Sequence, residues 1–284
     1  MDIFLIRGFK TMKNGFLCAV LILCLLCNIP LSAADDSSGN SGGDVSKVVG
    51  GDDVKPDELQ AVAALVPAGD PQYEGFFCSG VLIDSEWVLT AAHCAIKKTP
   101  HSIEVQLGSY HVEPGRGERL PVTEIFVHPD YIYNSVPDVA LLHLGTPSKY
   151  NPIPILTEVD SHLADPGTIG TASGWGRLSQ SEALYAVTLQ KVELPIISNE
   201  VCGSYSGDYP GWISEYEICA GYAYGFRDTS SGDSGGPLIV PDGDSWRTTG
   251  LTSWGNGVYY GVYARVSSVS DWIQDCMTNN SPNE

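Results

Sequence analysis

Residues 232–237 read Gly-Asp-Ser-Gly-Gly-Pro, and the interpretation of the whole chain starts from this hexapeptide. A serine hydroxyl is a poor nucleophile near neutral pH, so it needs a base that takes its proton and donors that stabilise the developing oxyanion. The glycines beside Ser234 leave room for a substrate, and Gly232 has no Cβ to screen its backbone N–H. Turns rich in Gly, Asp and Ser are common. The hexapeptide therefore indicates a nucleophilic serine only together with other motifs.

Two other motifs lie upstream of this turn. Residues 90–94 read Thr-Ala-Ala-His-Cys, and residues 138–142 read Asp-Val-Ala-Leu-Leu. Together with the hexapeptide they resemble, in order and spacing, the motifs of the trypsin/chymotrypsin family of serine proteases, and the resemblance extends from Val48 to the C-terminal helix. It implies an all-β fold of two antiparallel six-stranded β-barrels of the chymotrypsin type, with the active site between the barrels and a C-terminal helix.

The composition favours many short strands. The chain has 31 Gly and 18 Pro among 284 residues, and turn residues interrupt its apolar runs. The expected strands lie at residues 78–83, 87–90, 103–107, 123–127, 139–144, 171–176, 187–197, 218–221, 237–240 and 248–254, with a boundary between two halves near residues 150–160. Val269, Trp272, Ile273 and Cys276 recur at helical spacing, which predicts a closing helix capped by Ser268 or Ser270.

The chain is strongly acidic. It carries 34 Asp and Glu against 15 Lys and Arg, a net charge of −19. Such a field repels phosphate backbones and anionic lipid head groups, so we expect neither nucleic-acid nor membrane binding. We find no repeat of fixed period, which disfavours solenoids and propellers, and we expect a monomer.

The first 34 residues have the layout of a secretory signal peptide. Basic residues precede an apolar run at residues 16–27, and small residues follow as far as Ala34. A membrane-spanning helix is the alternative, but the run is shorter than the roughly 20 residues that a bilayer needs. We therefore expect residues 1–34 to be removed and the protein to be secreted.

A polar segment follows at residues 35–47 and ends at Lys47. The resemblance makes this segment an activation propeptide of a zymogen and residues 48–284 the protease domain. Cutting after Lys47 would free the α-ammonium group of Val48, which in the family pairs with the carboxylate that matches Asp233. A buried carboxylate needs such a partner, and the pairing would order the oxyanion turn. A linker that happens to end in Lys is the alternative.

The resemblance also assigns the catalytic roles. Ser234 would attack the scissile carbonyl, His93 would take the hydroxyl proton and return it to the leaving amine, and Asp138 would orient His93. The backbone N–H groups of Gly232 and Ser234 would form the oxyanion hole. The remaining histidines carry no comparable motif, and we expect His143 to face outward from its strand; they are His101, His111, His128, His143 and His162.

Asp228, six residues before Ser234, aligns with the pocket residue of trypsins. An entering Lys or Arg side chain would remove the cost of burying this carboxylate, so the resemblance implies cleavage after Lys or Arg. Gly255 and Gly261 would keep the pocket walls clear, and the strand of Ser253, Trp254 and Gly255 would pair with the substrate backbone. The alternative is a solvated loop carboxylate beside Arg227.

The pocket departs from the family at one point. The disulfide that usually joins the pocket walls is absent, because Ser230 and Val258 stand at the matching positions. Both cysteines are missing together, so no orphan thiol remains. We expect softer walls and a blunted preference for Lys and Arg.

Eight cysteines are present, and three leave with the signal peptide. The resemblance implies that Cys78 pairs with Cys94 and Cys202 with Cys219, while Cys276 has no evident partner and is read as a buried thiol. A calcium loop occurs in some family members, but Ser109 stands where trypsins often have a carboxylate. We expect no metal and no cofactor.

Two other functions are compatible with the sequence. A catalytically inactive homologue could act as a binding protein, although such homologues typically lose one of the three catalytic residues. A chymotrypsin- or elastase-type endopeptidase is the other alternative, and Asp228 argues against it.

Overall fold

The computed structural model describes residues 51–70, 75–112, 116–132, 135–178, 185–205, 212–223, 227–255 and 259–279. Lys47, Val48 and Val258, with the expected signal peptide and propeptide, lie outside this part of the chain. The strands of the first half are β1 (Asp52–Asp53), β2 (Val62–Pro67), β3 (Cys78–Asp84), β4 (Trp87–Thr90), β5 (Ile103–Leu107), β6 (Glu118–Val127) and β7 (Ala140–Leu144). Those of the second half are β8 (Ile169–Gly174), β9 (Gln190–Ile197), β10 (Glu217–Ala220), β11 (Pro237–Asp242), β12 (Ser245–Trp254) and β13 (Gly261–Arg265).

Helices are short and few among the described residues. The α-helices are α1 (Ala92–Ala95), α2 (Asn199–Ser204) and α3 (Ser270–Asn279), and the 3-10 helices are η2 (Pro100–Ser102), η3 (Ser161–Ala164) and η4 (Ser267–Val269). None of them is both long and apolar enough to pass through a bilayer.

The first barrel is closed and antiparallel. Its strands follow the order β2-β3-β4-β7-β6-β5, and β2 pairs with β5 to complete the ring. Leu65 on β2 illustrates the closure of the ring, because it pairs with Cys78 on β3 on one side and with Val105 on β5 on the other. Leu65, Leu89, Val105 and Leu141 are fully buried, so apolar side chains fill the barrel.

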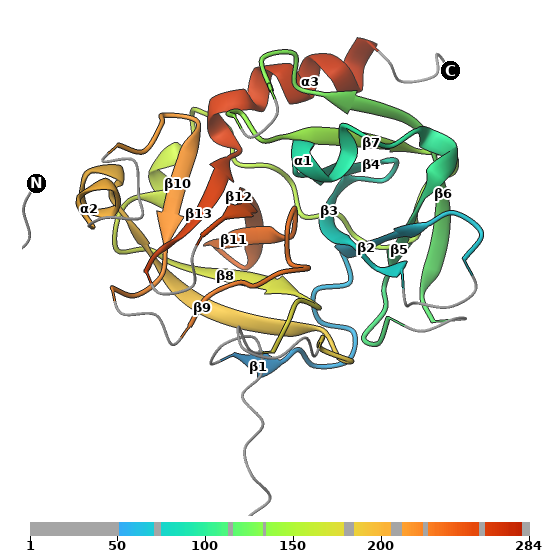
Figure 1. The fold of residues 1–284 in the computed structure, drawn as a ribbon, viewed down its shortest axis with the longest axis horizontal. Coiled ribbons are helices and arrows are strands. Elements are labelled where there is room, and N and C mark those ends of the chain that lie inside the picture. Colours follow the sequence, from blue (N-terminus) through green and yellow to red (C-terminus); the bar gives the residue numbers. More distant parts are fainter. Residues whose placement is uncertain are drawn as a thin grey trace, which may run out of the picture. The chain divides into compact units, whose positions relative to one another are not determined.

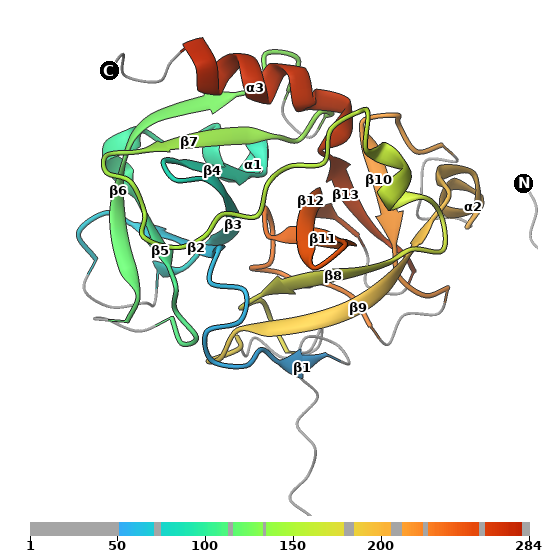
Figure 2. The same ribbon diagram turned by 180° about the vertical axis from the view of Figure 1, so that it is seen from behind.

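The second barrel is built in the same way. Its ring runs β8-β9-β10-β13-β12-β11 and closes where Leu238 on β11 pairs with Ala172 on β8, while β1 adds to β9 outside the ring. Figures 1 and 2 show the two barrels side by side, the first in cyan and green and the second in yellow-green to red. Two closed six-stranded antiparallel barrels and a short C-terminal helix confirm the predicted fold class.

The expected strands differ from the observed ones mainly at their ends. The strand expected at residues 123–127 begins five residues earlier, at Glu118, because residues 118–121 pair with β5 through the backbone. Two ring strands, β2 and β13, were not expected. Conversely, the strand expected from residue 187 begins at Gln190.

The C-terminal helix α3 follows the last strand of the second barrel but packs on the core of the first. Ile273 is fully buried in the same apolar cluster as Leu89 and Leu141, and Trp272 packs against it. The Trp272 ring also contacts that of His128, with centroids 4.8 Å apart. Figure 1 shows α3 in red beside β7 and α1.

The prediction that Ser268 or Ser270 caps the C-terminal helix is wrong. Ser270 is the first residue of α3, and Ser268 lies in η4 before it. The hydroxyls of Ser268 and Ser270 donate to the carbonyls of Arg265 and Ser267. The 3-10 turn therefore leads directly into the helix, which leaves no extended residue in the capping position.

Candidate active site

His93 and Asp138 are in direct contact. His93 Nδ1 lies 2.7 Å from Asp138 Oδ2, and the His93 backbone N–H donates to Oδ1 at 2.9 Å. Ser253 Oγ donates to Oδ2 at 2.6 Å, and Asp138 is only 4% exposed. A carboxylate only accepts hydrogen bonds, so this contact assigns a proton to Nδ1 and leaves Nε2 as the basic nitrogen.

Strand pairing brings these two residues together. The antiparallel strands β4 and β7 place Thr90 opposite Ala140, at the end of one strand and the start of the other. His93 follows three residues after Thr90, on the single-turn helix α1, and Asp138 precedes Ala140 by two residues. The small residues beside His93 allow the chain to close into this helical turn.

The turn that carries Ser234 comes from the second barrel and is bonded to the first. Ser79 on β3 makes two hydrogen bonds to this turn. The Ser79 N–H donates to the Ser234 carbonyl at 2.8 Å, and the Ser79 hydroxyl donates to the Gly232 carbonyl at 3.2 Å. Gly232 has φ +102° and Gly235 φ +78°, a region that favours glycine. A Cβ on Gly235 would also overlap the Thr90 side chain. The glycines thus permit the sharp turn and its close approach to β3 and β4.

Ser234 also approaches the helix that carries His93. Its carbonyl oxygen lies 3.7 Å from Cys94 Sγ, next in sequence to His93. Within the described residues, no hydrogen bond joins the His93 ring to the Ser234 hydroxyl. Such contacts between nucleophile and base are often long in the absence of substrate.

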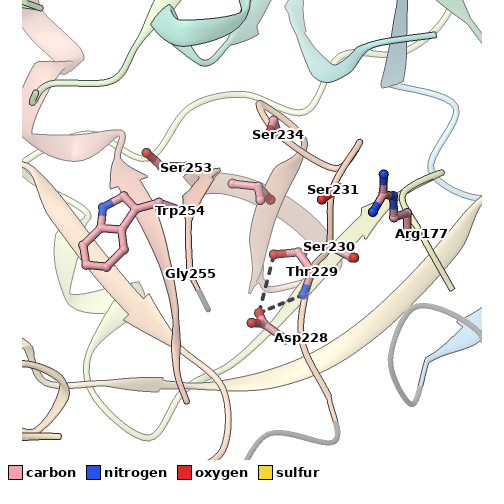
Figure 3. Close-up of a pocket in the computed structure, with 10 residues that line it drawn as sticks. Arg177, Asp228, Thr229, Ser230, Ser231, Ser234, Ser253, Trp254 and Gly255 are labelled. Carbon is pink, nitrogen blue, oxygen red and sulfur yellow. Dashed lines mark hydrogen bonds between the residues drawn. The ribbon is translucent and has the colours of Figure 1, made fainter. Parts of the chain in front are cut away.

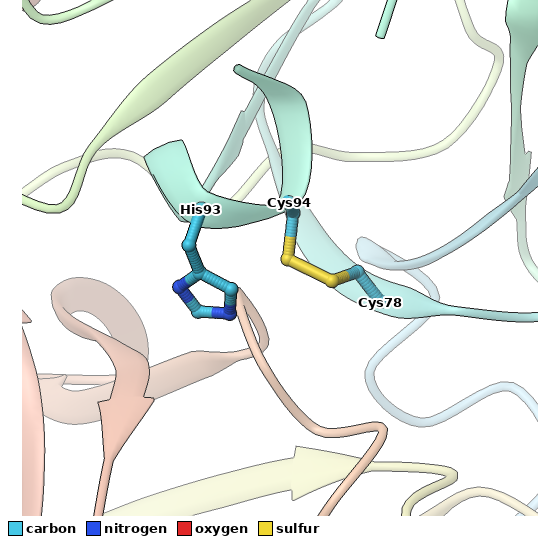
Figure 4. Close-up of side chains that lie close together, drawn as sticks. All are labelled: Cys78, His93 and Cys94. Carbon is cyan, nitrogen blue, oxygen red and sulfur yellow. A yellow bond between two sulfur atoms is a disulfide. The ribbon is translucent and has the colours of Figure 1, made fainter. Parts of the chain in front are cut away.

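The disulfides agree with the sequence analysis. Cys78 pairs with Cys94, and Cys202 pairs with Cys219. The first ties α1 to β3 beside the His93 ring, as Figure 4 shows. The nitrogen and sulfur atoms of Cys78, His93 and Cys94 lie within 4.8 Å of one another, the spacing of a metal site. A disulfide has no thiolate to offer, however, so this group does not fit a metal ion.

Asp233 is fully buried beneath the turn. Its carboxylate accepts the Gly176 N–H at 2.7 Å and the Ser230 N–H at 2.8 Å, while burial raises its pKa to about 6. A Cβ on Gly174 or Gly176 would overlap the carboxylate. The described ion pairs include none with Asp233.

Asp228 lies at a cavity of about 320 Å³ that Ser234 also lines. The acid is 3% exposed, and its Oδ1 accepts the Thr229 N–H at 2.8 Å (Figure 3). Burial raises its pKa to about 7. This burial contradicts the alternative of a solvated loop carboxylate.

Gly255 and Gly261 flank Asp228. A Cβ on Gly261 would lie 2.5 Å from Asp228 Oδ1, and one on Gly255 would lie 3.7 Å from Oδ2. A side chain at position 261 would therefore clash with the carboxylate, whereas a Cβ at position 255 would only contact it. Ser253, Trp254 and Gly255 line the same cavity (Figure 3). Ser230 and Arg177 line it as well, and sequence reasoning missed Arg177.

A second cavity, of about 820 Å³, adjoins the first through the shared lining residues Ser253 and Trp254. His93 and Asp138 line one part of it. Its other lining residues are Lys97, Tyr131, Ser135, Val136, Trp212 and Glu217. They come from five separate stretches of the chain, and no local motif marked them.

His143, which we expected to face outward, is buried. It is 6% exposed, its ring packs on Trp87 with centroids 4.6 Å apart, and its Nδ1 lies 3.0 Å from Thr123 Oγ1. The strand pairing places Trp87 directly opposite His143 and so covers the ring. His143 therefore belongs to the packing of the first barrel.

Comparisons with known proteins place the chain among proteases. The family model described as Trypsin matches residues 48–273. Trypsin-3 of Salmo salar is 33% identical over 241 residues, covering 82% of this chain and 94% of that relative. Trypsin I-P38 of Gallus gallus is 32% identical over 273 residues, covering 93% and 99%. Transmembrane protease serine 5 of Homo sapiens is 36% identical over 251 residues, covering 81% and 51%.

Proposed function

The chain belongs to the trypsin family of serine endopeptidases, and we propose that it is a secreted zymogen whose active form cleaves protein substrates after Lys or Arg. The observation that carries the specificity is Asp228, a buried carboxylate at a cavity that Ser234 also lines. An incoming ammonium or guanidinium group would supply a counter-charge, since none of the ion pairs among the described residues involves Asp228.

We infer the roles of the three catalytic residues from their contacts and from the family. His93 Nε2 accepts the proton of Ser234 as the hydroxyl oxygen attacks the scissile carbonyl, and the imidazolium then protonates the leaving amine. Asp138 stabilises that imidazolium through the 2.7 Å contact with Nδ1. Water then attacks the acyl-enzyme by the same proton transfers and releases the acid product.

The oxyanion hole is proposed at the N–H groups of Gly232 and Ser234. The positive φ of Gly232 supports this, because a left-handed residue at that position redirects its peptide N–H relative to an ordinary turn. Donors fixed in advance stabilise the tetrahedral intermediate without reorganisation.

Activation is proposed to follow a cut between Lys47 and Val48, which lie outside the described residues. The support is Asp233, a fully buried acid whose pKa burial raises to about 6. The new ammonium group of Val48 would pair with it and lower that pKa. Residues 1–34 act in this scheme as the signal peptide, residues 35–47 as the propeptide and residues 48–284 as the protease domain.

The remaining proposals concern partners and selectivity. The acidic net charge of −19 supports a monomeric enzyme that binds neither nucleic acid nor membranes. Ser230 lines the Asp228 cavity in place of a cysteine. Val258 stands at the position of the second cysteine of the family's pocket disulfide. The loss of both cysteines supports softer pocket walls and a smaller preference for cleavage after Lys and Arg over cleavage after other residues.

The test is an assay of protein that begins at Val48 against peptides that differ only in the residue before the cut. We expect peptides with Arg and Lys to be cleaved faster than those with Phe, Leu or Ala, and Ser234→Ala to abolish cleavage. Faster cleavage after Phe or Leu would overturn the specificity. Complete inactivity of a folded protein with a free Val48 amine would instead favour a binding protein without catalysis.

A further inference from the structure

The second cavity contains a buried carboxylate that the proposed mechanism does not use. Glu217 on β10 is 6% exposed and lines this cavity. Its Oε1 accepts the indole N–H of Trp254 at 2.8 Å, and its Oε2 accepts the Ser214 N–H at 2.8 Å. A carboxylate has about four acceptor positions, so these two bonds leave capacity for a donor from a ligand.

The described ion pairs do not involve Glu217. Arg265 is near in the fold, but its Nε donates to the backbone carbonyl of Glu217 and its Nη2 to Asn199. Lys97 lines the cavity, but it follows α1 on the first barrel, whereas Glu217 lies on β10 of the second.

Two indole rings line the cavity with this acid, and that of Trp254 is bonded to it. Trp254 is 37% exposed and Trp212 is 65% exposed, although both line the cavity. Tryptophan is the best aromatic partner for a cation, and the stems of Lys and Arg cover apolar surface while their heads remain polar. Exposed indoles beside a carboxylate thus match a long basic side chain better than an aliphatic one.

From this arrangement we propose that the second cavity binds a second basic side chain of the substrate, at the fourth position before the cut. The proposal rests on the proposed function, because it assumes that the first basic side chain occupies the Asp228 cavity. The enzyme would accordingly favour sites in which two basic residues are separated by two others.

The position follows from strand geometry. A substrate paired with Ser253–Gly255 is extended, so its side chains alternate between two faces. The Trp254 ring points away from Asp228 (Figure 3), and the second and fourth positions share that face. The second lies beside His93. The fourth position lies roughly 6.6 Å further along the extended substrate, on the side of Glu217. This direction follows from two hydrogen bonds of the pairing strand: Ser253 donates to Asp138, and the next residue, Trp254, donates to Glu217.

The experiment compares tetrapeptide amides that carry Arg at the cut, Ala at positions two and three, and Arg, Gln, Leu or Glu at position four. With enzyme that begins at Val48, at low ionic strength, we expect kcat/KM for Arg to exceed that for Gln by roughly 3- to 10-fold, the range of a partly exposed ion pair. High salt should reduce this ratio. Moving the second Arg from position four to position three should abolish the advantage of Arg over Gln.

Glu217→Gln should bring the ratio of kcat/KM for the Arg peptide to kcat/KM for the Gln peptide near one. Glu200→Gln is the matched control, because Glu200 is an exposed acid on α2 that lines neither cavity and its loss changes the net charge equally. That variant should keep the wild-type ratio.

An unchanged ratio in folded Glu217→Gln, or a wild-type preference for Gln or Leu over Arg at position four, would overturn the inference. If Glu217→Gln does not fold, the wild-type ratio and its salt dependence decide. Failure to cleave after Arg in any peptide would instead contradict the proposed function. Cleavage after Arg with no effect of position four would leave that function intact and reject only the second site.

Discussion

Asp228 and Asp233 lie five residues apart in sequence and are both buried acids, yet their surroundings differ. Asp233 has no exposed surface and accepts two backbone N–H bonds, whereas Asp228 is 3% exposed, accepts one and faces a cavity. Burial raises the pKa of Asp233 to about 6 and that of Asp228 to about 7. Two backbone N–H bonds offset the desolvation of charged Asp233, whereas Asp228 has one backbone N–H bond and a 3.5 Å bond from the Thr229 hydroxyl, and the charge of Asp233 raises the pKa of Asp228 further.

The comparison separates two uses of a buried carboxylate. A sealed acid such as Asp233 can pair only with a group from its own chain, and that pairing changes the conformation of the turn. An acid that opens on a cavity, such as Asp228, can pair with a ligand, and that pairing selects the ligand. Loss of the first should affect every substrate, and loss of the second only basic ones.

The largest effect is expected from Asp233→Asn in protein that begins at Val48. Without the carboxylate the oxyanion turn loses its ionic partner, and kcat/KM should fall about a thousandfold, the upper range for loss of an oxyanion donor. The loss should be equal for peptides with Arg and with Leu before the cut. A selective loss for Arg peptides alone would show that Asp233 acts in specificity.

Asp228→Ser should lower kcat/KM for Arg and Lys peptides by roughly 100-fold, because a basic side chain would enter the cavity unpaired. Peptides with Leu before the cut should change less than about threefold, within the range of a lost surface interaction. Parallel assays of the two peptides measure this difference. An equal loss for both would mean that Asp228 supports the turn, as Asp233 does.

Binding of a small cation should report the pKa of Asp228 directly. For Ser234→Ala protein with benzamidine, the dissociation constant should rise about tenfold between pH 8 and pH 6, because protonation of Asp228 below about pH 7 removes the counter-charge. Isothermal titration at several pH values tests this. The Asp228→Ser form of the same protein is the control, and a persisting pH dependence there would assign the effect to another group.

The smallest effect is expected from the segment between the two acids. The Ser230 N–H donates to Asp233, and Ser230 also lines the Asp228 cavity. Replacing Ser230 and Val258 with cysteines should restore the disulfide of the family and raise discrimination of Arg over Leu by about threefold, through a stiffer pocket. Mass spectrometry confirms the bond, and an unchanged ratio with the bond formed would reject the idea of softened walls.

Local motifs made much of this site predictable. His93, Asp138 and Ser234 each stand in a short run of characteristic residues, and Asp228 is tied to Ser234 by a fixed spacing. Asp228 is buried at a cavity that Ser234 also lines, and its role in specificity stays a prediction. The two barrels also followed from the family resemblance and from short apolar runs between turns.

The rest depended on contacts between distant segments. Glu217 and Trp212 lie in no recognisable sequence motif, and only the fold shows that they line the same cavity as Trp254. His143 was misjudged because alternation along a strand says which face a side chain takes, not whether Trp87 covers that face. Strand β13 was missed because Gly261 reads as a turn residue, although it pairs with Ala220.

The position of helix α3 bears on how the molecule holds together. The last ten described residues continue from the second barrel and bury Ile273 among strands of the first. The same apolar cluster takes Ile239, Leu251 and Ala264 from the second barrel. Neither half can lose its structure without exposing the interior of the other, so the two should melt as one cooperative unit and proteolytic nicking between them should not release a stable half.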